Sequence, residues 1–327
     1  MNPEELQGAL HQVMAQALGE PAVRTTPPQR LTGGASRETW SFDAVRGDGT
    51  AIPCILRRDP EGAPRRAGMA TEAVLLRAAG AAGVRAPRVL AAGDGDVLAA
   101  PYVIMERVEG ETIARRILRE PSLAEARAQL TAQCAQAAAR IHAIPVAAVP
   151  GLPDADPLVE YRGVLDSSGE PHPVFELAFR WLDAHRPRPR EPVVVHGDFR
   201  LGNLIVGPDG LRAVLDWELA HVGNPVEDLG WLCVRSWRFG AAGRVAGVGE
   251  AAELLAEYAR AGGAAVGEDE LFWWEVMGTL RWGVICIVQA ATHLTGAVRS
   301  VELAAIGRRV CEVEWDLLGL LEPVMRR

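Results

Sequence analysis

Residues 193–230 constrain the fold of this chain more than any other stretch, because short apolar runs alternate there with closely spaced polar side chains. The run Val193–Val195 predicts a short strand that leads into a His-Gly-Asp sequence. A second run, Leu204–Val206, is followed by a Pro-Asp-Gly turn and by the run Leu211–Leu215, which predicts a β-hairpin. The stretch therefore predicts three strands whose ends carry polar groups.

Three of these polar residues, Asp198, Asn203 and Asp216, supply hard oxygen donors. A carboxylate, an amide oxygen and a second carboxylate across a hairpin suit Mg²⁺ rather than Zn²⁺. No spacing of cysteines or histidines in the sequence competes as a zinc site. We therefore interpret the stretch as an active site that uses magnesium.

The order HGDxxxxN, hairpin, LDWE and GNPxxDLG resembles the catalytic core of protein-kinase-like enzymes, where H-R-D-x-x-x-x-N and D-F-G stand in the same order. Gly197 here replaces the Arg, and Trp217-Glu218 replaces Phe-Gly. This form is similar to the aminoglycoside phosphotransferase and choline kinase branch, which phosphorylates small molecules. The resemblance runs from about residue 22 to residue 235.

The resemblance implies a role for each polar residue of the stretch. Asp198 would be the base that faces the substrate hydroxyl, and Asn203 and Asp216 would be the magnesium ligands. Asp228 would support the catalytic loop. His196 is interpreted as a structural hydrogen-bonding residue rather than a proton carrier, because the neighbouring carboxylate already fills that role.

Simpler readings of single residues stay open. Any one of these acids alone is more simply a turn residue beside a hairpin, and only their joint order and spacing favours an active site. Glu218 either approaches the metal or is a solvated residue after the strand.

The charge balance of the chain is acidic. Asp and Glu number 42 against 34 basic residues, which gives a net charge of −8 and a pI of about 5.5. This balance argues against the basic surface that a nucleic-acid-binding protein needs. An anionic groove would instead suit a cationic substrate. The sequence contains no lysine. Any phosphate-binding role that related enzymes give to lysine must therefore fall to an arginine.

The sequence also bears on compartment and membrane. The five cysteines are scattered and show no CxxC pair, which argues against a disulfide framework and predicts a cytoplasmic location. The N-terminus has early acids and no basic region before an apolar core, so it does not read as a secretory signal. The apolar segment Val276–Ala291, interrupted by Arg281, is too short to span a bilayer and is predicted to be a buried helix.

A glycine-rich loop between two strands is the first candidate for nucleotide contact. After a predicted strand at Val23–Leu31, the loop places Gly33, Gly34 and Ser36 before a strand at Glu38–Val45. Backbone N–H groups in such a loop can approach phosphate oxygens because no Cβ is in the way. An isolated match of this kind is more often a hairpin turn, but its position ahead of the next two elements favours phosphate binding.

Those next elements are a strand at Ile52–Arg58 and a helix at Met69–Ala79. Strand alternation puts Arg57 on the face toward the nucleotide and Arg58 on the other face. In the kinase-like pattern a basic residue on the third strand pairs with a Glu on the following helix, and Glu72 matches that Glu. Arg57 is thus predicted to touch the ATP phosphates, although a longer, forked group replaces the usual Lys. A solvated strand end and an ordinary helix surface remain the simpler readings.

The segment PYVIMERVEGE resembles the hinge that links the two lobes of kinase-like enzymes. A strand over Tyr102–Arg107 would continue into the linker. The resemblance implies that the carbonyl of Glu106 and the N–H of Val108 face the adenine, with Met105 at the back of the pocket. A plain edge strand is the alternative.

The rest of the chain reads as helical. Ser122 is the predicted N-cap of the first long helix, His142 near its end is predicted to be buried and hydrogen-bonded, and Pro150–Pro173 is predicted to be a loop over the substrate site. The predicted helices are residues 1–20, Leu123–Ile144, Phe175–His185, Pro225–Arg235, Ala251–Ala261, Glu268–His293 and Val298–Leu321.

One of these helices carries candidate substrate-binding residues. Its start combines Glu268, Asp269 and Glu270 with Trp273, and acids beside aromatic rings can hold an amine. The alternative is that the helix dipole favours acids in a first turn and that the tryptophan belongs to the core.

The resemblance implies an α+β, two-lobed, protein-kinase-like fold. Residues 1–107 would form an N-terminal nucleotide-binding lobe with a five-stranded antiparallel sheet, and residues 108–327 a mainly helical catalytic lobe. The predicted function is transfer of the ATP γ-phosphate, with Mg²⁺, to the hydroxyl of a small molecule.

Several features of this function stay open. The acceptor could be an aminoglycoside, an amino alcohol metabolite or a hydroxyacyl-CoA, the last favoured if Arg235 and Arg238 line an entrance. A nucleotide-binding pseudokinase with a regulatory role is the alternative from another class. The sequence distinguishes neither ATP from GTP nor one oligomeric state from another.

Overall fold

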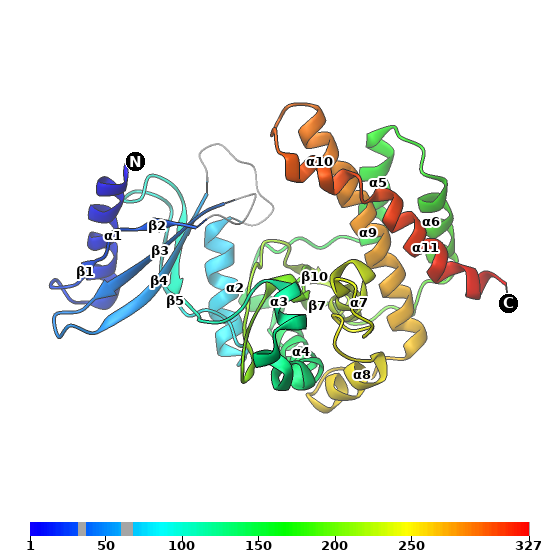
Figure 1. Ribbon diagram of the computed structural model, residues 1–327, viewed down its shortest axis with the longest axis horizontal. Helices are drawn as coiled ribbons and strands as arrows, with labels where there is room; N and C mark the ends of the chain where they lie inside the picture. The colour runs from blue at the N-terminus through cyan, green and yellow to red at the C-terminus, as the bar shows by residue number, and fades with distance from the viewer. Residues whose placement is uncertain (32–36, 60–67, 327) are drawn as a thin grey trace.

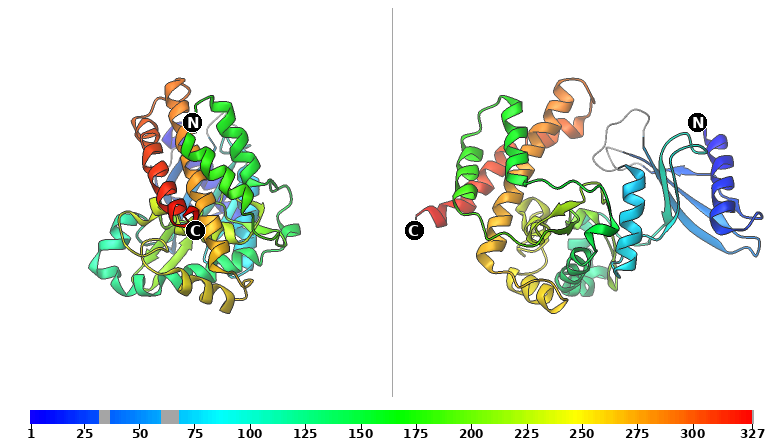
Figure 2. Two further views of the ribbon diagram at one scale, coloured as in Figure 1. Left: turned by 90° about the vertical axis from the view of Figure 1, so that its right-hand side faces the viewer. Right: turned by 180° about the vertical axis from the view of Figure 1, so that it is seen from behind.

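The computed structural model describes residues 1–31, 37–59 and 68–326, and it confirms the predicted two-lobed α+β fold. Figure 1 shows the sheet lobe, blue to cyan, on one side of the molecule and the helical lobe, green to red, on the other. The view from behind in Figure 2 shows the same division. The predicted phosphate-loop residues Gly33, Gly34 and Ser36 lie outside the described residues.

The sheet lobe contains one antiparallel sheet in the order β1-β3-β4-β6-β5, with β2 also paired to β3. The sheet has six described strands rather than five, because the predicted strand Val23–Leu31 is broken in two. Pro27 and Pro28 lie at the break and have no N–H to donate to a partner strand. The strands are β1 (Arg24–Thr25), β2 (Gln29–Arg30), β3 (Glu38–Val45), β4 (Ala51–Arg58), β5 (Val89–Gly93) and β6 (Tyr102–Glu106).

Two helices pack on this sheet. Helix α1 (Pro3–Leu18) begins with a capping box between Asn2 and Glu5 and buries Leu6 and Leu10 in a core shared with the sheet. Helix α2 (Met69–Ala81) lies between the sheet and the helical lobe (Figure 1), and its buried side chains belong to the large core of the helical lobe. The domain boundary after residue 107 stays a prediction, since that core crosses it.

The helical lobe is organised around α9 (Glu268–Leu294), which contacts α5, α6, α7, α10 and α11. Its length and composition would allow it to cross a membrane, but it is mostly buried inside the protein. The prediction of a buried helix over Val276–Ala291 is thus confirmed, and the predicted helix Glu268–His293 ends one residue earlier than α9 does. The other helices are α3 (Ala114–Arg119), α4 (Ala124–His142), α5 (Pro157–Ser168), α6 (Pro173–Ala184), α7 (Val226–Cys233), α8 (Ala251–Arg260), α10 (Val301–Gly307) and α11 (Val310–Met325), with short 3₁₀ turns η1 (Pro121–Leu123), η2 (Val146–Ala148) and η4 (Arg235–Arg238).

The predicted loop over Pro150–Pro173 is wrong, because α5 occupies half of it. Its start follows local rules: the Asp156 side chain accepts the N–H of Leu158 at 2.9 Å, and Pro157 takes the first helical position. One face of the helix, including Tyr161, is then buried.

Two other predictions need smaller corrections. The predicted single helix Val298–Leu321 is two helices, α10 and α11, separated by Arg308 and Arg309. Ser122 is not an N-cap, because Pro121–Leu123 forms a 3₁₀ turn that runs directly into α4.

Two small sheets carry the central stretch of the sequence. Strands β8 (Leu204–Gly207) and β9 (Gly210–Val214) form the predicted hairpin, and the 3₁₀ turn η3 (Leu201–Asn203) precedes it. Strand β7 (Val193–Val195) pairs with β10 (His221–Gly223). The sequence did not predict β10, because His-Val-Gly has no apolar run of the kind that marks β7. This pairing brings the chain after Asp216 back beside the His-Gly-Asp loop.

Candidate active site

The loop after β7 is held by the fully buried carboxylate of Asp228 at the start of α7. Its two oxygens accept the N–H groups of His196 and Gly197, each at 2.9 Å, and His142 Nε2 lies 3.1 Å from Oδ2. Burial alone would raise the pKa of Asp228, but the hydrogen bonds from His142 and His196 outweigh it and keep the pKa below its ordinary value. His142 is buried and also bonded to Tyr258 at 2.8 Å, as predicted.

Gly197 is required by the shape of this loop. Its φ is +78°, a conformation that costs glycine little. A Cβ at this position would lie 2.2 Å from the carbonyl oxygen of Leu219, so a side chain would push the loop away from the β10 segment. The carbonyl of Gly197 accepts a hydrogen bond from Arg281 of α9 at 2.8 Å.

His196 is a buried, neutral hydrogen-bonding residue in this arrangement. Its Nε2–H donates to the carbonyl of Leu215 at 3.0 Å, and its Nδ1 accepts the N–H of Asp198 at 3.2 Å. Burial lowers the pKa of His196, against the opposing effect of the Asp228 carboxylate. Both ring nitrogens are occupied, so the side chain ties the loop to the end of the hairpin.

Asp198 lies at the end of this loop, largely buried, with a donor on each carboxylate oxygen. Oδ1 accepts from Arg200 Nε at 2.9 Å and from Trp231 Nε1 at 2.8 Å. Oδ2 accepts from Asn203 Nδ2 at 2.6 Å. These donors fix the carboxylate in one orientation.

Asn203 and Asp216 are held side by side across the β8–β9 hairpin. The N–H of Leu215 donates to the backbone carbonyl of Asn203 at 2.8 Å, so the residue after Leu215 begins next to Asn203. The amide nitrogen of Asn203 donates to Asp198. The amide oxygen of Asn203 is therefore the atom of this side chain that could bind a metal ion. Asp216 has a left-handed backbone with φ of +65°, an uncommon state that is frequent at functional sites.

The sheet lobe contributes an arginine network. Arg57 Nη1 donates to Glu72 Oε1 at 2.5 Å, and Arg57 Nη2 lies 3.3 Å from Asp216 Oδ1. The other oxygen of Glu72, which is buried, pairs with Arg37. Glu72 thus joins two guanidinium groups, and Arg57 connects the sheet lobe to the end of the hairpin. The pairing of Arg57 with Glu72 is the one the family resemblance implies.

The chain leaves the sheet after Arg107, which is where the predicted linker between the lobes begins. Glu106 donates its N–H to Arg88 at 2.9 Å, and the N–H of Arg107 donates to Pro53 at 2.9 Å, so both residues still belong to the sheet. Within the ranges that the structure describes, the N–H of Val108 has no hydrogen-bond partner. Met105 is buried beside it.

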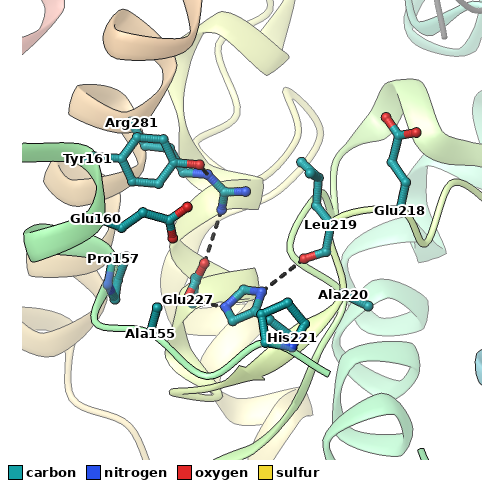
Figure 3. A pocket seen from close by; sticks show the side chains of 11 residues that line it. Ala155, Pro157, Glu160, Tyr161, Glu218, Leu219, Ala220, His221, Glu227 and Arg281 are labelled. Carbon is teal, nitrogen blue, oxygen red and sulfur yellow. Dashed lines mark hydrogen bonds and ion pairs between the residues drawn. The ribbon is translucent and has the colours of Figure 1, made fainter. Parts of the chain in front are cut away.

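A small polar pocket lies next to this site, between α5, α9 and the segment that follows Asp216 (Figure 3). Arg281 Nη1 donates to Glu227 at 3.0 Å, and Arg281 Nε donates to the hydroxyl of Tyr161 at 2.9 Å. The other oxygen of Glu227 lies 3.1 Å from His221 Nε2, and His221 Nδ1 lies 2.9 Å from the carbonyl of Leu219.

Two properties of this pocket follow from its residues. Burial opposes the charged form of His221, but the Glu227 carboxylate outweighs burial and raises the pKa of His221 to about 9. Both ring nitrogens then donate. The pocket has a volume of only about 30 Å³, room for one or two water molecules.

The predicted substrate residues do not lie at this site. Glu268, Asp269, Glu270 and Trp273 occupy the start of α9, while Arg281 touches the loop from further along the same helix. At about 1.5 Å per residue, these residues lie roughly 12 Å (Trp273) to 20 Å (Glu268) from Arg281 along the helix axis. Glu270 pairs with Arg190, and Trp273 Nε1 donates to the carbonyl of Leu182 at 3.0 Å, so both have structural roles.

Several residues of the site were not predicted. Arg200 and Trp231 hold Asp198, and Arg281 with Glu227 supports the loop from α9 and α7. Only Arg200 offered a signal in the sequence, since it lies between Asp198 and Asn203. The others are 29 or more residues away from Asp198 in the sequence, and no local pattern connects them to it.

The chain matches the family model of the phosphotransferase enzyme family over residues 28–269, well over half of its length. Among curated proteins it is 32% identical over 200 residues to mouse acyl-CoA dehydrogenase family member 10, covering 55% of this chain and 18% of that protein. It is 26% identical over 227 residues to human acyl-CoA dehydrogenase family member 11, covering 62% of this chain and 29% of that protein. The chain thus spans less than a third of the length of these relatives.

Solved structures show the same fold. A putative aminoglycoside phosphotransferase from Ralstonia eutropha has a TM-score of 0.73 at 22% identity, covering 95% of this chain and 97% of that one. A choline/ethanolamine kinase family protein from Mesorhizobium loti has a TM-score of 0.61 at 21% identity, covering 96% and 95%. An aminoglycoside phosphotransferase solved with GDP and kanamycin has a TM-score of 0.63 at 14% identity, covering 96% and 98%.

The family model covers the sheet lobe, the linker and the whole His-Gly-Asp to α7 region, and the solved structures share both lobes over nearly their full length. The chain belongs to the phosphotransferase enzyme family, whose members share this two-lobed, protein-kinase-like small-molecule kinase fold.

Proposed function

We propose that this protein transfers the γ-phosphate of ATP to a hydroxyl group of a small molecule, with Asp198 as the base and Mg²⁺ held by Asn203 and Asp216. The observation that carries the proposal is the joint arrangement of these three side chains beside Arg57. Such transfer is mostly positioning and charge stabilisation, and both requirements are met by groups already fixed in the described residues.

The donor set suits magnesium. The amide oxygen of Asn203 and the carboxylate of Asp216 are hard oxygen donors, and two protein ligands leave room for phosphate oxygens and water in an octahedral shell. Within the described residues no cluster of three His, Cys, Asp or Glu side chains offers an alternative metal site. When bound, the ion would neutralise charge on the phosphates of the nucleotide.

The chain's own residues supply the remaining steps. Asp198 accepts the proton of the acceptor hydroxyl while the new O–P bond forms, and the bond from the γ-phosphorus to the β–γ bridging oxygen breaks to release ADP. Arg57, held by Glu72, pairs with the phosphates in place of the lysine that this chain lacks. Asp228 and His196 keep the loop in place.

Nucleotide binding between the lobes is supported by the fold and by the free N–H of Val108 beside Glu106. A structural neighbour was solved with GDP, so ATP and GTP both belong in the test. The glycine loop with Gly33, Gly34 and Ser36 stays part of the proposal as a cover for the phosphates.

Three acceptor classes are supported by the comparisons. Aminoglycosides and amino alcohols follow from the structural neighbours, and a hydroxyacyl-CoA follows from relatives that carry the acyl-CoA dehydrogenase name. Five unpaired cysteines, four of them buried, support the proposed cytoplasmic location. We propose no nucleic-acid or membrane partner.

The test is consumption of ATP or GTP by the purified protein, with Mg²⁺, against aminoglycosides, macrolides, choline-like amines, sugars and hydroxyacyl-CoAs. Asp198→Ala should lower turnover by about a hundredfold or more while nucleotide binding is retained. Asp216→Ala should also weaken Mg²⁺-dependent nucleotide binding. Asp209→Asn, at an exposed turn of the same hairpin, is the matched control and should leave turnover unchanged.

Turnover that is equal in wild type and Asp198→Ala would reject Asp198 as the base. Tight nucleotide binding with no turnover on any acceptor would instead favour the pseudokinase alternative.

A further inference from the structure

The carboxylate of Glu275 in α9 is buried and is not one of the groups that the proposed reaction uses. Only 1% of the residue is exposed. Oε1 accepts a hydrogen bond from Arg238 Nη2 at 2.6 Å, and Oε2 accepts from Arg244 Nε at 2.9 Å and from Arg244 Nη2 at 2.6 Å. Burial raises the pKa of the Glu275 carboxyl, and the two arginines oppose this rise. Because taking a charge out of water is unfavourable, the carboxylate and the two guanidinium groups depend on one another.

Both arginines come from one segment, residues 235–249, which follows α7. Arg238 ends the 3₁₀ turn η4, and its guanidinium also donates to the carbonyl of Cys233 from Nε at 3.1 Å and from Nη2 at 2.8 Å. Arg244 lies further along the segment. Glu275 therefore fastens the segment to α9 at two points, and Arg238 also fastens it to the end of α7.

The backbone of this segment needs support from its surroundings. Phe239 and Ala246 have positive φ values of +48° and +51°, and Gly240 and Gly247 have positive φ values as well. For a residue with a side chain, such a conformation costs about 1–3 kcal/mol and persists only where surrounding contacts enforce it. The two ion pairs to Glu275 are contacts of this kind, and they lie on both sides of Phe239 and Gly240.

One aromatic ring of the segment supports both of the donors that hold the proposed base. Trp237 lies beside Arg238 in η4 and is only 5% exposed. Its ring centre lies 4.7 Å from the guanidinium of Arg200 and 5.2 Å from the ring of Trp231. These two side chains donate to Asp198 Oδ1 at 2.9 and 2.8 Å. The position of η4 therefore affects how the carboxylate of Asp198 is held.

Close contact between α7 and α9 makes the Glu275 carboxylate a fixed point for η4. A Cβ on Gly230 of α7 would lie 2.5 Å from the Cβ of Trp274, and a Cβ on Gly278 of α9 would lie 2.9 Å from Val234 Cγ2. The two glycines thus let the helix backbones approach each other on either side of Glu275, and this leaves little freedom for one helix to shift against the other.

We propose that Glu275 is a positioning residue for the proposed base. Its charge holds η4 and the Trp237 ring in place, and that ring holds the two donors of Asp198. The inference rests on the proposed function, because the base belongs to that reaction. Glu275 acts through η4 rather than by touching the reacting groups. Loss of its charge should therefore disturb the base and leave the nucleotide contacts of the sheet lobe unchanged.

The test uses Glu275→Gln, which keeps the size of the side chain and removes its charge. One readout needs no turnover: the indole N–H signal of Trp231 in a heteronuclear NMR spectrum, assigned by its loss in Trp231→Phe. In Glu275→Gln this signal should move to lower proton frequency, because the hydrogen bond to the carboxylate lengthens. The kcat should fall by about tenfold with an unchanged KM for the nucleotide. Glu302→Gln, at an exposed acid of α10, is the control and should give the wild-type signal and kcat.

Arg238→Gln removes the same contact from the η4 side and should repeat both effects, so it decides the outcome if Glu275→Gln does not fold. A wild-type Trp231 signal or an unchanged kcat in the folded variant would overturn the proposal. A nucleotide affinity that falls as much as kcat would also overturn it, because a general loss of structure weakens both. If the wild type phosphorylates no acceptor but the signal responds as expected, the proposed kinase reaction fails and the positioning of Asp198 by Glu275 stands.

Discussion

At the scale of single residues, the site depends on how the Asp198 carboxylate is held. Trp231 donates its indole N–H to Asp198, and its ring lies between the guanidinium of Arg281 at 4.6 Å and the ring of Trp237 at 5.2 Å. The Arg200 guanidinium, the second donor to Asp198, lies 4.7 Å from the Trp237 ring. Cation–π and ring contacts thus link the guanidinium groups of Arg281 and Arg200 to the indole rings of Trp231 and Trp237 around the proposed base.

Trp231→Phe should lower kcat by about tenfold with little change in the KM for ATP, because it keeps the aromatic ring but removes one hydrogen bond to a charged group. The control is Trp237→Phe, since the Trp237 N–H is buried without a partner among the described residues. Steady-state kinetics of the two variants checks this, and an equal loss in both would show that the ring rather than the N–H matters.

His221 should make stability depend on pH. Its folded pKa of about 9 lies above its ordinary value of 6.5, so the charged pair with Glu227 stabilises the fold fully below pH 6.5 and loses this contribution as pH rises toward 9. The shift corresponds to about 3 kcal/mol. In urea unfolding, the stability difference between wild type and His221→Gln should therefore be largest near pH 6 and small near pH 9.5. A difference that does not change with pH would contradict the pairing.

At the scale of elements, α9 supports the catalytic loop through one buried cation. Arg281 is only 4% exposed and joins Tyr161, Glu227 and the carbonyl of Gly197. The start of the helix, with Glu268, is far from this contact.

Arg281→Met should destabilise the protein by about 3–5 kcal/mol, because it breaks the buried ion pair with Glu227 and leaves that carboxylate with His221 alone. Arg299→Gln, an exposed arginine just after the end of α9, should change the free energy of unfolding by less than about 0.5 kcal/mol. Chemical denaturation measures both, and a small effect of Arg281→Met would show that Glu227 is satisfied without the arginine.

At the scale of the whole molecule, the two lobes meet at the site itself. Arg57 from the sheet and Asp216 from the helical lobe form an ion pair at 3.3 Å with 18% and 32% of their side chains exposed. A nucleotide with its metal would bind between them, so binding should stabilise the whole fold.

A non-hydrolysable ATP analogue with Mg²⁺ should raise the melting temperature by several degrees, because a ligand that binds only the folded state stabilises it by mass action. EDTA should remove most of this shift, and Asp216→Asn should reduce it, while the exposed-turn variant Asp209→Asn should respond as wild type does. Differential scanning fluorimetry checks the prediction, and an undiminished shift in EDTA would contradict the magnesium site.

Local patterns in the sequence were sufficient for the β8–β9 hairpin and for the order of Asp198, Asn203 and Asp216, and the family resemblance carried by these motifs implied the fold class and the pairing of Arg57 with Glu72. Each depends on alternation, turn residues or a motif read within a short stretch, and such patterns determine local hydrogen bonds. The same local chemistry should have revealed α5, whose cap at Asp156 and Pro157 was hidden among turn-forming residues.

Only the tertiary structure decided what surrounds Asp198. The packing of α7, α9 and α5 against one loop brings Trp231, Arg281 and Glu227 to the site, and it leaves Glu268 and Trp273 nearer the start of α9. These contacts join residues far apart in the chain, and which helix faces meet is determined by burial of the whole core rather than by any local pattern.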